Sequence, residues 1–143
     1  MNVSSAAGLF GFPWHAAYSA AKFGLRGVSE VLRFDLRRHG IGVTLVCPGA
    51  VDTPLVDTME IAGVDRSRPA LQKMAKRFRK HAATPDKVAA QILRAVERER
   101  YLVLTSADIH LLYLVQRICP PLYALVMRRM NDIFVRVLTR SAR

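Results

Sequence analysis

Residues 2–22 read NVSSAAGLFGFPWHAAYSAAK, and the interpretation of the whole chain starts from this stretch. Tyr18 and Lys22 are four residues apart, which places both side chains on one face of a helix. A lysine ammonium beside a phenol favours the phenolate, so this tyrosine could exchange a proton with a substrate oxygen. Ser5 comes thirteen residues before Tyr18, where a short strand is expected to end. Its hydroxyl could form a hydrogen bond with the same substrate oxygen.

This set of residues, with Asn2-Val3-Ser4-Ser5 before it and Phe23-Gly24 after it, resembles the catalytic signature of the short-chain dehydrogenase/reductase family. The resemblance implies that Tyr18 is the general acid and base and that Ser5 orients the substrate carbonyl. It also implies that Lys22 supports the phenolate and holds the nicotinamide ribose. The alternative is a buried tyrosine and a solvated lysine on an ordinary helix.

Residues 6–17 are predicted to form a loop, because glycines and a proline interrupt them. The resemblance implies that this loop borders the substrate pocket. Together with Ser5, the candidate substrate residues are Phe10, Phe12, Trp14 and His15. For each aromatic residue, packing at the start of the next helix is the alternative. A Ser5–His15 hydrolase pair is disfavoured, because no G-x-S-x-G motif surrounds Ser5 and no paired acid is evident.

Residues 16–39 are predicted to form one helix, because apolar residues recur at helical spacing and Gly40 follows as a stop signal. The resemblance implies that this helix pairs with its copy in a second subunit, giving a homo-oligomer. Residues 41–47 form a β-branched, apolar run that suits a parallel strand buried on both faces.

A second motif, Pro48-Gly49-Ala50-Val51-Asp52-Thr53-Pro54, follows this strand. It resembles the family's Pro-Gly-x-Val-x-Thr turn, which contacts the nicotinamide carboxamide and the phosphates. The implied cofactor is NAD or NADP. The implied cofactor-binding residues are Tyr18, Lys22, Pro48, Gly49, Val51 and Thr53. A glycine also allows a ligand to approach the backbone closely.

Residues 54–83 contain a predicted basic helix around Leu71 and Phe78, and the resemblance implies a mobile lid over the substrate. Its basic side chains, which include Arg66 and Arg68, are interpreted either as a solvated helix face or as a surface that binds an anionic partner. Thr84-Pro85-Asp86 is typical of a helix start, and residues 101–104 are predicted to form a strand.

Residues 107–143 are predicted to form an amphipathic helical tail in two parts, separated by Pro120-Pro121. Its apolar runs are shorter than the roughly 18 residues that span a bilayer. The tail, with arginines extending to Arg140, could pack on a partner subunit, close the substrate pocket, or contact an anionic membrane surface weakly.

The chain has 143 residues, 51% of them hydrophobic, and a formal net charge of +11, which suits one globular domain. Cys47 and Cys119 stand among apolar residues and are predicted to be buried free thiols, as in a reducing cytosol. The cysteine spacing indicates no metal site. Nucleic-acid binding is disfavoured because no stacking aromatics interleave the charges. We therefore expect a cytoplasmic protein, with peripheral membrane contact as the alternative.

The resemblance implies an α/β fold with a Rossmann-like, doubly wound parallel sheet, of which the chain supplies the C-terminal portion. Residues 1–106 would be the C-terminal half of that domain, and residues 107–143 the tail. No glycine-rich phosphate-binding turn occurs in the sequence, so Met1 is expected to be internal to a longer reading frame, or the sequence a fragment. The implied function is NAD(P)-dependent interconversion of a carbonyl and an alcohol, on a lipophilic substrate. The alternative is a non-catalytic fragment that serves as an interaction or membrane-surface module.

Overall fold

The computed structural model describes residues 1–55 and 69–139, with side chains as far as residue 137. The predicted lid residues Arg66 and Arg68, and Arg140 of the tail, lie outside these residues. The described strands are β1 (Asn2–Val3), β2 (Leu45–Cys47) and β3 (Leu102–Leu104). The described α-helices are α1 (Ala16–Asp35), α3 (Pro69–His81), α4 (Pro85–Glu97), α5 (Ala107–Ile118) and α6 (Pro120–Thr139). Two 3-10 helices, η1 (Ala6–Gly8) and η2 (Arg37–His39), flank α1.

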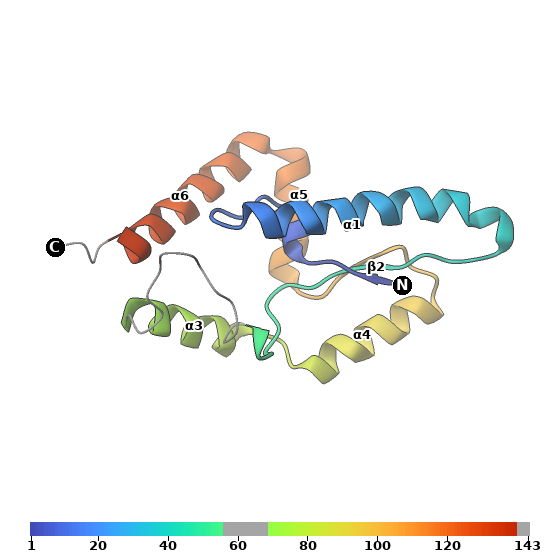
Figure 1. Ribbon diagram of the computed structural model, residues 1–143, viewed down its shortest axis with the longest axis horizontal. Helices are drawn as coiled ribbons and strands as arrows, with labels where there is room; N and C mark the ends of the chain where they lie inside the picture. Colours follow the sequence, from blue (N-terminus) through green and yellow to red (C-terminus); the bar gives the residue numbers. More distant parts are fainter. Residues whose placement is uncertain (56–68, 140–143) are drawn as a thin grey trace.

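The three strands form one parallel sheet in the order β1-β2-β3, which confirms the predicted α/β fold. Alternate residues of β2 pack on opposite faces of the sheet. Leu45 and Cys47 belong to a buried cluster with Phe10, whereas Val46 packs against Ala95 of α4. Accordingly, α1 and α4 lie on opposite sides of the strands (Figure 1).

Some predicted elements are shorter in the structure than in the sequence pattern. Residues 41–47 were expected to form one strand, but only Leu45–Cys47 form β2, and Ile41 is exposed. The predicted helix over residues 16–39 is α-helical to Asp35 and continues as η2. The predicted loop at 6–17 contains η1 and the first two residues of α1. Gly40, at φ 67°, ends η2 in the left-handed conformation expected of a helix stop.

The remaining helices form where the sequence indicates them. Thr84 caps α4 by accepting a hydrogen bond from the Lys87 backbone at 3.4 Å, and Pro85 occupies the first turn. In the tail, Pro120 and Pro121 begin α6 rather than only breaking the preceding helix.

The tail packs on the core near the N-terminus, since Tyr123 and Met127 of α6 contact the cluster that contains Phe10. Cys47 is fully buried as predicted. The prediction for Cys119 is wrong, because the turn between α5 and α6 leaves this thiol exposed. Within the described residues, no helix is long and apolar enough to cross a bilayer.

Candidate functional site

The candidate site lies at the carboxyl end of the sheet, where β1 and β2 give way to loops. The chain after β1 stays paired with the chain after β2, because the Ala6 backbone N–H donates to the Pro48 carbonyl at 2.8 Å. Ser5 and the Pro48-Gly49 turn therefore come to the same edge of the sheet. This is the edge at which open α/β sheets bind their ligands.

Three side-chain hydrogen bonds join α1 to residues 2–4, and a fourth lies within α1. The Asn2 amide donates to Ser29 Oγ at 2.9 Å, and Ser29 in turn donates to the Leu25 carbonyl at 2.7 Å. Ser4 Oγ donates to the Lys22 carbonyl at 3.0 Å. The Lys22 ammonium reaches back to the Val3 carbonyl at 3.4 Å. These bonds set the position of the Tyr18–Lys22 turn relative to the end of β1.

Asn2, Ser4 and Ser29 are positioning residues that the sequence patterns did not identify. Ser4 and Ser29 are buried. The sequence does contain one sign of this anchoring: Ser29 lies on the same side of the helix as Leu25 and Leu32. A buried polar group in such an apolar stripe needs a hydrogen-bond partner.

Tyr18 and Lys22 lie together as the helical spacing predicts. The Lys22 ammonium is 5.6 Å from the centroid of the Tyr18 ring, and the Tyr18 side chain is 40% exposed. Ser5 Oγ accepts a hydrogen bond from the Ala7 backbone at 3.1 Å and so caps η1. Because that contact uses an oxygen lone pair, the O–H of Ser5 is left as a donor for a ligand.

The predicted substrate residues separate into two groups. Phe10 is fully buried in the core, edge-on to Phe12 with ring centroids 5.9 Å apart. This is the packing alternative that the sequence left open. By contrast, the Trp14 side chain is 52% exposed. The His15 ring packs edge-on to the Phe134 ring of α6, with ring centroids 6.3 Å apart. Trp14 also has φ 67°, a left-handed backbone that is uncommon for residues other than glycine.

The Pro-Gly turn is held from two directions. The Gly49 N–H donates to Thr105 Oγ1 at 3.1 Å, and a Cβ at Gly49 would lie 2.6 Å from Ser106 Oγ. Gly49 is therefore needed for packing against the start of α5. Farther along, Val51 forms a parallel bridge with Ala83. Its bonds use the Ala50 carbonyl and the Asp52 N–H, not the N–H and carbonyl of Val51.

The buried end of β2 lies beneath these loops. Burial raises the pKa of the Cys47 thiol from 9.0 to about 11, against the opposing effects of the Arg26 charge and a hydrogen bond with Ser4. A thiol of this kind stays protonated at neutral pH. Cys47 thus acts as a small apolar core residue below Ser4 and Ser5, not as a nucleophile.

The residues at this edge fit a nicotinamide cofactor. Val51 has an N–H and a carbonyl outside the Ala83 bridge, a donor and acceptor pair suited to a carboxamide. The Lys22 ammonium lies at the end of β1, where it donates to the Val3 carbonyl, and the Tyr18 phenol is partly exposed beside it. Among the described residues, no group of histidine, cysteine or carboxylate side chains could hold a metal ion.

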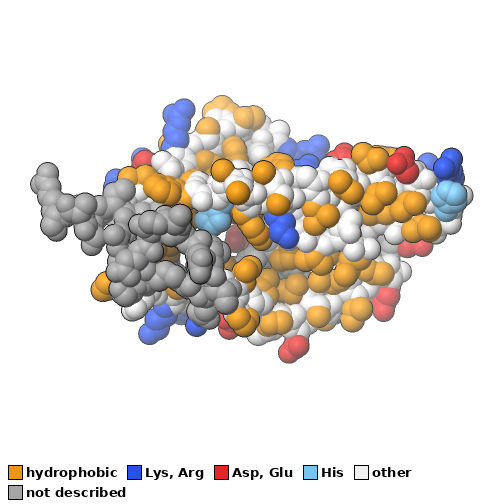
Figure 2. Space-filling view, in the orientation of Figure 1, with side chains coloured by type: hydrophobic (Ala, Val, Ile, Leu, Met, Phe, Trp, Pro, Cys, Tyr) orange, Lys and Arg blue, Asp and Glu red, His pale blue; other side chains and the backbone are white. Residues whose placement is uncertain are grey.

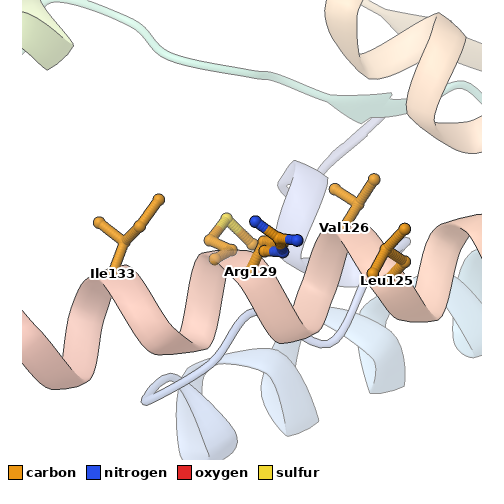
Figure 3. Close-up of a pocket in the computed structure, with 5 residues that line it drawn as sticks. Leu125, Val126, Arg129 and Ile133 are labelled. Atoms are coloured by element: carbon orange, nitrogen blue, oxygen red, sulfur yellow. The ribbon is translucent and has the colours of Figure 1, made fainter.

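A second surface lies along α6. Figure 3 shows Leu125, Val126, Arg129 and Ile133 on this helix, and together with Met130 they line a shallow groove. All five residues come from the one helix. The Ile133 side chain is 56% exposed and the Leu125 side chain is 50% exposed.

Comparison with known proteins assigns this arrangement to a family. The family model described as short chain dehydrogenase matches residues 1–62, the part that contains Ser5, Tyr18, Lys22 and the Pro-Gly turn. Residues 1–62 belong to the short-chain dehydrogenase/reductase family. The family's fold is also found among solved structures. A short chain dehydrogenase/reductase from Burkholderia phymatum, in complex with NAD, aligns with a TM-score of 0.68 and 27% identity over 85% of this chain and 47% of its own.

Two curated relatives show how far the similarity extends. A probable oxidoreductase named EphD, from Mycobacterium tuberculosis, is 31% identical over 84% of this chain and 21% of its own length. A 3beta-hydroxysteroid dehydrogenase from Mediterraneibacter gnavus is 33% identical over 65% of this chain and 39% of its own. The chain thus spans between about a fifth and two fifths of the length of these relatives.

Proposed function

We propose that this chain carries the catalytic site of an NAD- or NADP-dependent oxidoreductase that interconverts a carbonyl and an alcohol. The observation that supports this most is the Tyr18–Lys22 pair, anchored to the end of β1 beside Ser5. Neither residue is in the closed core, so a substrate could reach the phenol.

Each catalytic residue has a role that follows from its surroundings. In the reducing direction, the Tyr18 hydroxyl would give its proton to the carbonyl oxygen, and in the oxidising direction the phenolate would take a proton from the alcohol. Ser5 would donate its free O–H to the same oxygen. The Lys22 ammonium, next to the Tyr18 ring, would favour the phenolate form.

The cofactor would be held by the turn after β2 and by α1. We assign this role to Lys22 and Tyr18 and to Pro48, Gly49, Val51 and Thr53. The N–H and carbonyl of Val51 would meet the carboxamide, and Lys22 the ribose. When bound, the nicotinamide supplies or accepts the hydride.

The proposed substrate is a small, lipophilic ketone or alcohol. Phe12, Trp14 and His15 lie on the loop before Tyr18, and Phe134 of α6 meets His15. The tail, residues 107–143, would thereby add to the site built on residues 1–106. A relative named as a 3beta-hydroxysteroid dehydrogenase gives independent support for a lipophilic substrate.

We also propose two surfaces for association. Val28, Val31 and Phe34 of α1 are more than half exposed, and Figure 2 shows hydrophobic side chains spread along this helix. Gly24 and Gly27 leave open space beside the α1 backbone, so a second copy of the helix could approach closely. The groove of α6, with exposed Arg128, Arg129 and Arg136, would allow weak contact with an anionic membrane.

Turnover of the Tyr18→Phe variant tests the proposed function. With a panel of lipophilic ketones and NADH or NADPH, the variant should lose about 10²–10⁴-fold in rate, the usual effect of removing a general acid. Its circular dichroism should match the wild type, because the Tyr18 ring is retained. Equal turnover by the two proteins would exclude Tyr18 as the proton donor. The absence of turnover by the wild-type chain would favour the non-catalytic alternative.

A further inference from the structure

A second cavity, of about 710 Å³, lies between α1, the start of β3 and α5. None of its lining residues belongs to the proposed dehydrogenase site. Leu45 and Leu102, which begin β2 and β3, contribute to it, whereas the Pro-Gly turn and Ser5 lie at the other end of these strands.

The cavity wall carries an excess of positive charge. Arg26 and Arg33 come from α1 and Arg117 from α5, and the only carboxylate in the lining is Glu30. Three guanidinium groups against one carboxylate give a net charge of +2. Within the described part of the chain, the structure records no ion pair between Glu30 and these arginines. The positive charge is therefore available to an anion that enters the cavity.

Two of the arginines are held in place by tyrosine rings. The Arg33 guanidinium lies 4.4 Å from the centroid of Tyr101, and that of Arg117 lies 5.6 Å from the centroid of Tyr113. Arg117 also donates to the Tyr113 hydroxyl at 3.1 Å. A guanidinium that contacts an aromatic ring keeps N–H donors for a carboxylate or phosphate.

Tyr101 supplies an unused polar group in the same cavity. Its hydroxyl is buried and has no hydrogen-bond partner among the described residues. Burial raises the pKa of Tyr101, and the Glu30 charge raises it further, while Arg26 and Arg33 lower it. The hydroxyl is thus protonated at neutral pH and is a donor without an acceptor. Buried polar groups in folded proteins rarely remain unpaired.

Apart from Gln116, the rest of the lining is apolar. Phe23 is 39% exposed and Leu102 is partly exposed, so these two side chains offer apolar surface to a ligand, whereas Leu9 and Leu45 are fully or almost fully buried. An inorganic anion would leave this surface unused, whereas a ligand with an apolar body would cover it. We propose that the cavity binds an amphiphilic organic anion, a carboxylate or phosphate monoester on an apolar body, whose head group is held by Arg26, Arg33, Arg117 and the Tyr101 hydroxyl.

Calorimetric titration of the purified chain with decanoate, decyl phosphate and neutral decanol tests this proposal. Both anions should bind at a single site, and decanol about tenfold or more weakly, because it lacks the charge that the guanidinium groups recognise. Affinity for decanoate should fall as salt rises. Equal binding of decanol, or many weak sites, would overturn the proposal.

Variants identify the site of binding. Replacing Arg26 and Arg33 together with glutamine should weaken decanoate binding about tenfold or more. The same change at Arg94 and Arg98, which are exposed at α4, removes equal charge and should leave affinity within about twofold. Equal losses in the two double variants would show non-specific attraction and overturn the proposal. If the variant at Arg26 and Arg33 does not fold, Tyr101→Phe provides the second comparison. Tyr101→Phe should bind decanoate more weakly than the wild type. Unchanged binding would contradict the role of the Tyr101 hydroxyl as a donor to the head group.

Discussion

Replacing Gly8 with alanine should destabilise the chain by displacing the helix that carries Tyr18 and Lys22. An ideal Cβ at Gly8 would lie 2.7 Å from the Lys22 carbonyl oxygen and would also collide with Ser4 Oγ. The first of these atoms is backbone and cannot rotate away. The methyl group would also compete with the Ser4–Lys22 hydrogen bond.

The expected cost combines two effects. Overpacking a tight contact typically costs about 1–3 kcal/mol, and a lost hydrogen bond about 0.5–1.5 kcal/mol. We therefore expect a loss of roughly 2–4 kcal/mol, and a fall in Tm of about 5–15 °C for a chain of this size. Thermal melts followed by circular dichroism measure this change.

Gly11 provides the matched control, because nothing lies within 4 Å of the position of its missing Cβ. Gly11→Ala should therefore melt close to the wild type. If Gly8→Ala and Gly11→Ala melt at the same temperature, the close approach of η1 to α1 does not exist as described. In that case the proposed anchoring of Lys22 fails with it.

Three further outcomes are expected. Because Cys47 has a pKa raised from 9.0 to about 11, its proton stabilises the fold fully below pH 9, and this stability is lost as pH rises through 11. Measured by urea unfolding, Cys47→Ala should lose less unfolding free energy than the wild type between pH 9 and pH 11. The same pH dependence in both proteins would contradict the burial of the thiol. Trp14 has φ 67°, so Trp14→Gly should be more stable than Trp14→Ala by about 1 kcal/mol, measured by chemical denaturation; equal stability would exclude the strained backbone. Anionic vesicles should sediment the chain weakly and only at low salt, since α6 offers a narrow apolar groove with arginines; salt-resistant sedimentation would point to a stronger anchor.

The sequence predicts the helices well because their signals are local. Thr84 and Pro85 mark the start of α4, and Gly40 marks the stop after η2. The family resemblance likewise predicts the α/β sheet. The strand ends were less predictable, since pairing depends on neighbours: Ile41 and Val43 continue the apolar pattern of β2 but lie before the paired segment.

The site was predictable only in part. Tyr18 and Lys22 are brought together by helical spacing, which the sequence shows directly. The anchoring by Ser4 and Ser29 depends on contacts with residues 18 and 27 positions away in the sequence, respectively. Contacts over such separations follow no fixed residue spacing that a sequence pattern could reveal. The exposure of Cys119 was mispredicted for a similar reason, because apolar neighbours in sequence do not determine which side of a turn faces solvent.

Titration of NADH and NADPH into the purified chain, followed by nicotinamide fluorescence, most directly tests the proposed cofactor site around Lys22. We expect saturable binding of at least one cofactor. Lys22→Ala should weaken it about tenfold or more, because a charge-assisted hydrogen bond is lost. Tyr18→Phe should bind nearly as well as the wild type, and so should Lys87→Ala, which removes an exposed ammonium on α4. Failure of both cofactors to bind, or unchanged binding by Lys22→Ala, would contradict the proposed site.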